Sequence, residues 1–372
     1  MSDMLRREFL QAATTAGVVI LATAVHSAPV AKGKRIKIGQ IGTKHAHAAG
    51  KMDAVRRLGE LYEVVGIVEA DDDQWARIGS KAPYAGLPRL SEDDLLGRSD
   101  VEAIVVETRM HDSAATAARA IAAGKHIHLD KPGAMGHAEF KAMRLEAERR
   151  GLTVQMGYML RYNPAFELMF RGARDGWFGE WLEVDAMMGK LAPAGMRREL
   201  AELPGGGMFE LACHIIDAAV TLLGKPTAVH AFTKRTRDDA SSEPGDQAAD
   251  NQLAVLEYAK ATATIRCNHA DPFGGPRRRF QAAGTEGAIE IMPLESGKCR
   301  LMLGAPHGEF KKGEQSLTLT VPPGRYDGEF VDLAKVVRGE KALAWNAAHD
   351  IAVHEAVLRA SGALSNAPAA AH

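Results

Sequence analysis

The chain contains 372 residues, of which 46% are hydrophobic and 25% are charged, and its formal net charge is −1. Such a length allows two substantial domains, and the composition is typical of a soluble globular protein. The near-neutral charge argues against a nucleic-acid partner and against attraction to an anionic membrane surface. The three cysteines are widely spaced, so they predict neither a disulfide framework nor a metal-binding pair.

The N-terminal segment has the layout of a signal peptide. Arg6 and Arg7 precede a modest apolar run over residues 12–25, which is too short and too weakly apolar to span a membrane. The arrangement resembles a twin-arginine (Tat) export signal. We therefore expect residues 1–31 to be a signal peptide that engages the Tat export machinery, with no stable membrane insertion and a periplasmic or secreted protein as the product. The cleavage site stays open, and an uncleaved amphipathic helix is the alternative.

The next part of the chain alternates between strand-like and helical segments. Strands are predicted over residues 35–41, 62–70, 100–108, 125–130 and 152–157, and helices over 46–61, 71–81, 113–124 and 137–151. Strands that are each separated by one helix predict βαβ units, and hence a parallel sheet with helices on both faces. Residues 34–157 are therefore predicted to form a doubly wound α/β domain.

The pattern changes after residue 158. Helices are predicted over residues 163–177 and 208–224, with one strand over 180–190 between them. Further strands are predicted over residues 228–235, 252–259, 261–270, 277–284, 288–293, 300–304 and 316–322. They indicate an open, mostly antiparallel sheet, and its exposed face needs a covering partner, so we expect a homodimer or homotetramer. Two helices, over residues 328–339 and 347–361, end the ordered chain.

Five motifs carry a resemblance to a known family: GQIGT, GKHIHLDKPG, GYMLRYNPAF, GGGMFELACHIID and AAGTEGAIEI. Together they resemble the Gfo/Idh/MocA family (glucose–fructose oxidoreductase and inositol dehydrogenase), over nearly all of residues 34–361. The resemblance implies an NAD(P)-dependent oxidoreductase that acts on the CH–OH group of a sugar, glycoside or cyclitol. It also implies a Rossmann-type domain over residues 34–157, an α+β substrate and oligomerisation domain over 158–346, and a C-terminal helix and tail over 347–372.

The motif LDKPG places Lys131 at the C-terminal end of a predicted parallel strand, where α/β sheets hold their ligands. A partly desolvated lysine has a lowered pKa and can pass a proton or donate a hydrogen bond to a reacting oxygen. In the family, the lysine of a Glu-Lys-Pro motif lies between the nicotinamide and the hydroxyl that is oxidised. Lys131 matches that lysine, and Asp130 stands in place of the glutamate. A surface lysine before a turn proline is the alternative interpretation.

The motif FELACHIID is predicted to lie on a helix. There Glu210, His214 and Asp217 fall at i, i+4 and i+7 and project from one face. Such a stripe suits a proton-handling site with His214 as the general base for a hydroxyl proton. Glu210 stands where the family has an aspartate, and the resemblance implies that Asp217 bonds a sugar hydroxyl. A core histidine flanked by solvated acids is the alternative.

The segment GYMLRYNPAF resembles the family's segment after the fifth strand. By that resemblance, Arg161 and Asn163 contact substrate hydroxyls or the carboxamide of the cofactor. A surface charge and a helix cap are the alternative roles of these two residues.

The loop after the first strand begins like a dinucleotide-binding fingerprint and then departs from it. Gly42 supplies the tight turn, but Lys44 and His47 occupy the places of the second and third glycines. A side chain at the second place is expected to collide with a phosphate unless the loop shifts. The positive charge of Lys44 can, however, pair with that phosphate.

Other predicted cofactor contacts follow later strands. Glu69 ends the second strand and is expected to bond the adenosine ribose, which favours NAD over NADP. The pair Thr108–Arg109 replaces the family's Thr-Pro in the third βα turn, which is a second departure. The predicted cofactor-binding residues are Gly42, Thr43, Lys44, His45, Glu69, Thr108, Arg109, Asp130 and Lys131.

Two main hypotheses about function remain. In the first, NAD(H) binds tightly, and Lys131 and His214 carry out hydride transfer on a carbohydrate or cyclitol. After export no free NAD is supplied, so the cofactor is re-oxidised in place, by a second substrate or within a redox-neutral cycle. In the second, no nucleotide binds, and a divalent metal serves a hydrolase or lyase with a carbohydrate-like substrate. Its candidate ligands are His45, His47, Glu210 and His214. A non-catalytic sugar-binding protein is a third class.

Overall fold

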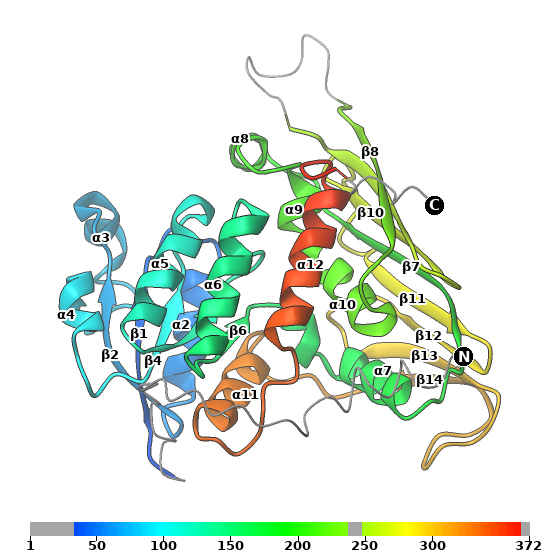
Figure 1. Cartoon of the computed structure of the whole chain (residues 1–372), viewed down its shortest axis with the longest axis horizontal. Coiled ribbons are helices and arrows are strands. Elements are labelled where there is room, and N and C mark those ends of the chain that lie inside the picture. Colours follow the sequence, from blue (N-terminus) through cyan, green and yellow to red (C-terminus); the bar gives the residue numbers. More distant parts are fainter. Residues whose placement is uncertain (1–32, 237–247, 366–372) are drawn as a thin grey trace.

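The structure, a computed structural model, describes residues 33–236 and 248–365. The described residues form two sheets with helices packed against them (Figure 1). The predicted signal peptide lies outside the described residues. Of the helices in the described ranges, none combines the length and the hydropathy needed to cross a lipid bilayer.

The first sheet is parallel and six-stranded, in the order β3-β2-β1-β4-β5-β6. Its strands are β1 (Ile36–Ile41), β2 (Tyr62–Val68), β3 (Arg89–Leu90), β4 (Ala103–Val106), β5 (His126–Leu129) and β6 (Val154–Met156). The helices of this domain are α2 (Ala48–Arg57), α3 (Asp72–Ile78), α4 (Glu92–Leu96), α5 (Met110–Ala122) and α6 (His137–Arg149). Every residue of β4 and β5 is buried, as expected for strands covered on both faces. The predicted doubly wound domain is confirmed.

The sequence pattern did not predict β3 and α4. They contain two and five residues, which are too few to show a repeating pattern of hydrophobic residues. A local signal exists for α4, because the Ser91 side chain accepts a hydrogen bond from the backbone N–H of Asp94 and caps the helix.

The second sheet has eight strands, in the order β14-β13-β12-β11-β7-β10-β9-β8. Its strands are β7 (Trp181–Gly189), β8 (Ala228–Lys234), β9 (Asn251–Glu257), β10 (Thr262–Asn268), β11 (Arg279–Gly284), β12 (Gly287–Ile291), β13 (Lys298–Leu303) and β14 (Gly313–Thr318). Neighbouring strands are antiparallel except for β7 and β10, which are parallel. The predicted open, mostly antiparallel sheet is confirmed.

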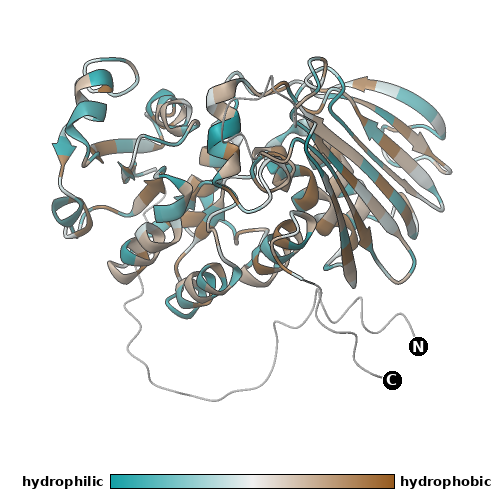
Figure 2. Ribbon diagram, turned by 90° about the horizontal axis from the view of Figure 1, so that it is seen from above, coloured by the Kyte–Doolittle hydropathy of each residue, from teal (hydrophilic) through white to brown (hydrophobic). Residues whose placement is uncertain are grey.

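Helices cover one face of this second sheet. The helices after β6 are η1 (Met159–Tyr162), α7 (Pro164–Arg174), α8 (Ala194–Ala201), α9 (Gly207–Glu210), α10 (Cys213–Leu223), α11 (Asp327–Val337) and α12 (Ala347–Ala360). Of these, α7, α9, α10 and α12 contact strands of the second sheet, and α12 also contacts α6 of the first domain, whereas α11 contacts α2 and η1 (Figure 1). Ile265, Phe280 and Leu301 point into this core and are buried. In the described part of the chain, no helix lies on the opposite face (Figure 2).

The single helix predicted over residues 208–224 is wrong, because the structure breaks it into α9 and α10. The carbonyl of Gly207 accepts hydrogen bonds from the backbone N–H groups of both Leu211 and Ala212, at 2.8 and 3.2 Å. The turn between the helices is therefore wider than an α-helical turn, and Glu210 and His214 lie on different helices. Glu210, His214 and Asp217 therefore do not project from one face of a single helix, as the sequence analysis predicted.

Candidate active site

A cavity of about 540 Å³ lies at the carboxyl edge of the first sheet, beyond β1, β2 and β4. Gly42, Lys44, Glu69, Thr108 and Arg109, all predicted to contact a cofactor, line it. Parallel α/β sheets bind their ligands at this edge, where the strand order reverses on the two sides of β1.

Gly42 makes the tight turn that opens this cavity. Its φ angle is +88°, and a Cβ atom at this position would lie 2.7 Å from the backbone of both Glu107 and Thr108. The loops after β1 and β4 approach each other so closely that only glycine fits. The structure therefore has Gly42 in the predicted turn, and the close backbone contact explains why the turn requires glycine.

Glu69 is held at the end of β2 by its neighbours. Its carboxylate accepts hydrogen bonds from the Thr43 hydroxyl at 2.5 Å and from the backbone N–H of Asp71 at 3.0 Å. The carboxyl group is thus fixed at the cavity wall, although it is already partnered within the chain.

Lys44 pairs with Asp71 in this structure. The Lys44 Nζ atom lies 2.6 Å from Asp71 Oδ2, and this hydrogen bond is the main reason that the pKa of Asp71 is lowered to about 2. The expected pairing of Lys44 with a phosphate therefore requires that it leave Asp71.

The cavity fits the adenosine part of a dinucleotide. It combines the glycine turn, an acid at the end of the second strand and sufficient volume. In addition, the Thr108 hydroxyl at its wall is buried and has no hydrogen-bond partner among the described residues. A buried hydroxyl without a partner is costly unless a ligand satisfies it.

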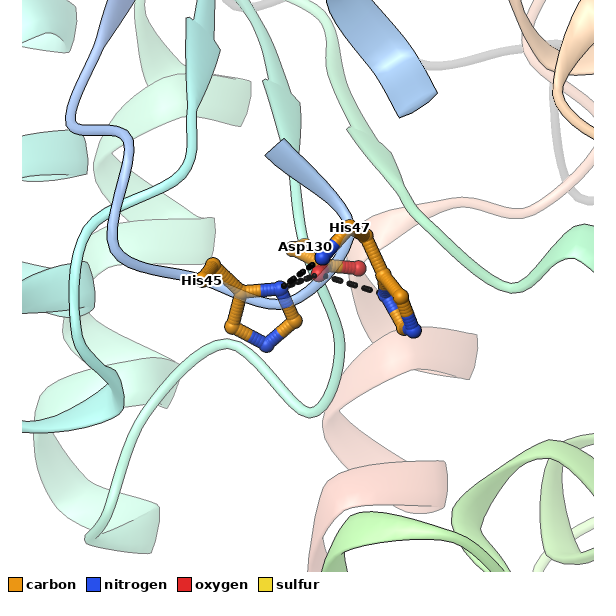
Figure 3. A group of neighbouring side chains, drawn as sticks. All are labelled: His45, His47 and Asp130. Carbon is orange, nitrogen blue, oxygen red and sulfur yellow. Dashed lines mark hydrogen bonds and ion pairs between the residues drawn. The ribbon is translucent and has the colours of Figure 1, made fainter. Parts of the chain in front are cut away.

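A second group of side chains lies beside this cavity. The side chains of His45 and His47 both point toward Asp130, which follows β5 (Figure 3). The His47 Nδ1 atom lies 2.9 Å from Asp130 Oδ2, and His45 Nδ1 is in direct contact with the same oxygen. Burial lowers the pKa of His45, but the carboxylates of Asp130 and Glu107 outweigh it and raise that pKa to about 9. For His47, burial outweighs Asp130 and the pKa is lowered.

Two residues of this group were missed by the sequence analysis. Lys51 and Glu107 are fully buried, and Lys51 Nζ lies 3.1 Å from Glu107 Oε1 and 2.8 Å from Asp130 Oδ1. Helical spacing could have identified Lys51, because it shares the buried face of α2 with Ala48, Met52 and Val55. A lysine on an apolar helix face requires a buried carboxylate partner.

Lys131 reaches across to the second domain. Its Nζ atom lies 3.0 Å from Glu210 Oε1 and also donates to the backbone carbonyl of Glu210. The prediction of a lowered lysine pKa is wrong here. Burial lowers the pKa of Lys131, but the Glu210 carboxylate raises it more, so the ammonium form is stabilised. Lys131 therefore acts as a charged hydrogen-bond donor.

His214 is buried in the same region, near the first turn of α10. Burial lowers its pKa well below the usual value, and the charges of Lys131 and His47 lower it further. The imidazole is therefore neutral at pH 7. Its Nδ1 atom has no hydrogen-bond partner in the part of the chain that the structure describes, and its ring lies 5.8 Å from that of Tyr158.

The three predicted substrate residues have structural partners. Arg161 is buried, and it donates to Asp217 at 2.6 and 2.9 Å and to Asp350 at 2.8 Å. The alternative of a surface charge is therefore wrong for Arg161. Asn163 caps α7 by accepting a hydrogen bond from the backbone N–H of Ala165, so the alternative role as a helix cap is observed. Contact of these residues with a substrate stays a prediction.

The predicted metal set is only partly brought together. Within the described ranges, His45 and His47 converge with Asp130 as a group whose potential ligand atoms all lie within 4.8 Å of one another. Glu210 is paired with Lys131 instead, and His214 is not a member of the group.

Comparison with known proteins identifies both domains. Residues 36–158 match a model described as an oxidoreductase family with an NAD-binding Rossmann fold. Residues 169–290 match the Gfo/Idh/MocA C-terminal domain. The chain belongs to the Gfo/Idh/MocA family. Because the first match is to an oxidoreductase family, the hydrolase or lyase hypothesis has no support.

Individual relatives are distant. The uncharacterized oxidoreductase YhhX of Escherichia coli (strain K12) is 26% identical over 58% of this chain and 61% of that protein. The scyllo-inositol 2-dehydrogenase (NAD(+)) of Bacillus subtilis (strain 168) is also 26% identical, over 61% of this chain and 66% of that protein. A structure of levoglucosan dehydrogenase in complex with NADH and levoglucosan has a TM-score of 0.75 at 19% identity, covers 88% of this chain and 98% of its own, and shares the fold.

Proposed function

We propose that this family member oxidises a hydroxyl group of a sugar, glycoside or cyclitol and uses NAD(H) held by its first domain. The names of the scyllo-inositol and levoglucosan dehydrogenases support the substrate class. The observation that carries the proposal is the ion pair between Lys131 and Glu210. This pair joins a charged donor of the nucleotide-binding domain to α9 of the second domain, and the charge of Lys131 contributes to lowering the pKa of the buried His214.

The residues of this chain divide the chemistry between them. Bound NAD⁺ would supply the hydride acceptor, with its adenosine part in the cavity at Gly42, Glu69 and Thr108. The ammonium group of Lys131 uses two hydrogens on Glu210, and its third can be donated to the substrate oxygen. As a hydroxyl becomes a carbonyl, that oxygen keeps the hydrogen bond, and the hydroxyl proton passes to the neutral imidazole of His214.

Glu210 positions the donor in this scheme. Burial raises the pKa of its carboxyl group, but Lys131 and Lys190 outweigh burial and lower it, so the group is ionised at neutral pH. An ionised Glu210 keeps Lys131 charged and fixes its direction. The longer side chain, where the family has aspartate, reaches Lys131 from α9.

The test is the release of bound nucleotide. The purified chain is denatured, and the supernatant is separated by chromatography and assayed for NAD(H) by absorbance and by an enzymatic cycling assay. We expect close to stoichiometric NAD(H). Protein that carries no nucleotide, and that binds neither added NAD⁺ nor added NADH in calorimetry, contradicts the proposal.

The resemblance of residues 1–31 to a twin-arginine signal leads to a further part of the proposal, which is export. A protein that leaves the cytoplasm folded would carry its NAD(H) tightly bound and re-oxidise it within a redox-neutral cycle. Replacing Arg6 and Arg7 with lysine is expected to leave the protein in the cytoplasmic fraction, whereas the unaltered chain reaches the periplasm. If both chains were found in equal proportions in the cytoplasmic and periplasmic fractions, the proposal of export would be contradicted, but the proposed oxidation would not.

A further inference from the structure

We infer that His45, His47 and Asp130 form a binding site for one divalent transition-metal ion, with Zn²⁺ and Fe²⁺ as the ions that these ligands suit. The inference does not depend on the proposed hydride transfer. It is a correction of the predicted set of ligands, because Asp130 replaces Glu210 and His214.

Geometry supplies the first argument. Ligands that lie about 2.0–2.2 Å from one ion are roughly 3–4 Å from each other. The His47 Nδ1 and Asp130 Oδ2 atoms are 2.9 Å apart, and all three candidate atoms lie within 4.8 Å of one another. The two imidazoles approach the same carboxylate oxygen from one loop (Figure 3). Small side-chain rotations would place one ion between them.

Glu107 supplies a second, independent observation. This residue is fully buried, and neither of its carboxylate oxygens has a hydrogen bond among the described residues. Its Oε1 atom forms an ion pair with Lys51 at 3.1 Å, whereas Oε2 lies 3.5 Å from His45 Nδ1. The Glu107 carboxylate is therefore paired with Lys51 and lies beside His45, one of the proposed ligands.

The surroundings of the site are buried. The carboxylates of Asp130, Glu107 and Glu329 interact with the buried ammonium of Lys51, and Asp130 also interacts with the buried ammonium of Lys131. Burial raises the pKa of Glu329 to about 8, so Asp130 and Glu107 are the ionised carboxylates beside the two histidines.

Lys51 also supports the proposed ligand carboxylate. It bonds Asp130 Oδ1 at 2.8 Å and leaves Oδ2 facing the two histidines. Partners of this kind orient a metal-binding carboxylate, and their loss typically weakens metal binding by about 10–100-fold. Lys51 is thus a positioning residue for the site.

The ligand set indicates the class of ion. Two imidazoles with one carboxylate and open positions suit Zn²⁺ or Fe²⁺, whereas Mg²⁺ and Ca²⁺ prefer oxygen ligands. Three protein ligands leave positions that water or an oxygen atom of a ligand can complete. Asp130 precedes Lys131 directly, so these positions adjoin the proposed hydroxyl-binding group.

The experiment measures metal binding without any enzymatic assay. The full chain is stripped with a chelator and titrated with Zn²⁺ by calorimetry and with Co²⁺ by absorption spectroscopy. We expect about one ion per chain and a cobalt spectrum of nitrogen and oxygen ligation. His47→Asn and Asp130→Asn are each expected to weaken binding by at least about 10-fold, as is Lys51→Met through its loss of support.

Two variants serve as controls. His230→Asn changes an exposed histidine on β8 and is expected to bind Zn²⁺ like the unaltered chain. Lys131→Met removes the proposed hydroxyl donor and should keep the metal, which separates this inference from the proposed function. Thermal unfolding with and without Zn²⁺ shows whether each variant is folded. A stripped chain that takes up no ion, or equal affinity in His47→Asn and His230→Asn, overturns the inference.

Discussion

The side chains of Lys131 and Glu210 form a 3.0 Å ion pair that joins the two domains of this chain. Lys131 follows β5 of the first sheet, and Glu210 is the last residue of α9. The Lys131 side chain is only 1% exposed, so each charge depends on the other. Removing one partner leaves an unpaired buried charge, which costs about 3–5 kcal/mol. A test of catalysis at this pair must therefore separate chemistry from stability.

Lys131→Met is expected to lower turnover by about 10²–10⁴-fold, because the donor to the substrate oxygen is lost. Steady-state rates with a responsive sugar or cyclitol measure this, and bound nucleotide is quantified in the same samples. The matched control for stability is the double variant Lys131→Met with Glu210→Gln, which leaves no unpaired charge. Should the double variant melt like the unaltered chain and still turn over at the full rate, Lys131 has no catalytic role.

Gly42→Ala is expected to destabilise the fold by about 1–3 kcal/mol and to weaken nucleotide binding, because its Cβ atom would lie 2.7 Å from backbone atoms at a φ of +88°. Calorimetry with NAD⁺ and chemical denaturation measure the two effects.

The control for this glycine is Gly195→Ala on α8. No atom lies within 4 Å of a Cβ at this position, and alanine favours a helix more than glycine does. We expect Gly195→Ala to be neutral or slightly stabilising. Equal effects of the two substitutions would show that the loop after β1 is free to shift.

The sequence predicts the architecture well because both domains repeat simple periods. Alternating helices and strands give the parallel sheet, and alternate apolar residues give the open one. The break between α9 and α10 is not predictable in this way. Apolar residues continue at helical spacing across Leu211 and Ala212, and only the shared carbonyl of Gly207 shows that the hydrogen bonds change.

The site was predicted less completely than the fold. Lys131 and Glu210 were recognised from motifs, but their direct pairing depends on how the domains meet, which local spacing does not encode. The buried carboxylates Glu107 and Glu329 come from segments more than 200 residues apart, and nothing in either segment indicates the other. Contacts of this kind require the three-dimensional fold.

Arg161 is expected to be essential for stability. Its guanidinium is shared by the buried carboxylates of Asp217 and Asp350, so Arg161→Met breaks two buried ion pairs and should cost about 3–5 kcal/mol. Arg144 still pairs with Asp350 and His349 with Asp217, so neither carboxylate is left without a partner. Urea denaturation measures the change. Arg98→Met is the control, because Arg98 forms an exposed pair with Asp100 that is worth at most about 1 kcal/mol. A cost for Arg161→Met as small as that for Arg98→Met would contradict the structural role of this network.

Stability is expected to fall as the pH drops from about 6.5 toward 4, because of buried neutral histidines such as His354. Burial lowers the pKa of His354 from 6.5 to about 4. Between these values the unfolded chain binds a proton that the folded chain does not, so the stabilisation is complete above pH 6.5 and is lost below it. For His354 alone the effect is about 3 kcal/mol.

The measurement is urea denaturation at pH values from 7.5 to 4 in steps, an interval that brackets the two pKa values of His354. His354→Gln keeps a group that can donate to the Ala134 carbonyl but cannot titrate, so its stability should depend less on pH. The exposed His230, replaced by Gln, should leave the pH dependence unchanged. If the free energy of unfolding depended on pH equally in both variants and in the unaltered chain, His354 would not be taking up a proton on unfolding.

The uncovered face of the second sheet is expected to pair with another copy of the chain. This face carries a hollow of about 170 Å³, lined by residues of β7, β11, β12 and β13 that include Ala288. An arginine at Ala288 would fill the hollow and add a charge, so Ala288→Arg should convert a dimer or tetramer into a smaller species. Size-exclusion chromatography with light scattering measures the mass.

Ala138→Arg, on the exposed side of α6, is the matched control and should leave the assembly intact. A monomeric unaltered chain, or an unchanged mass for Ala288→Arg, would mean that this face serves another purpose.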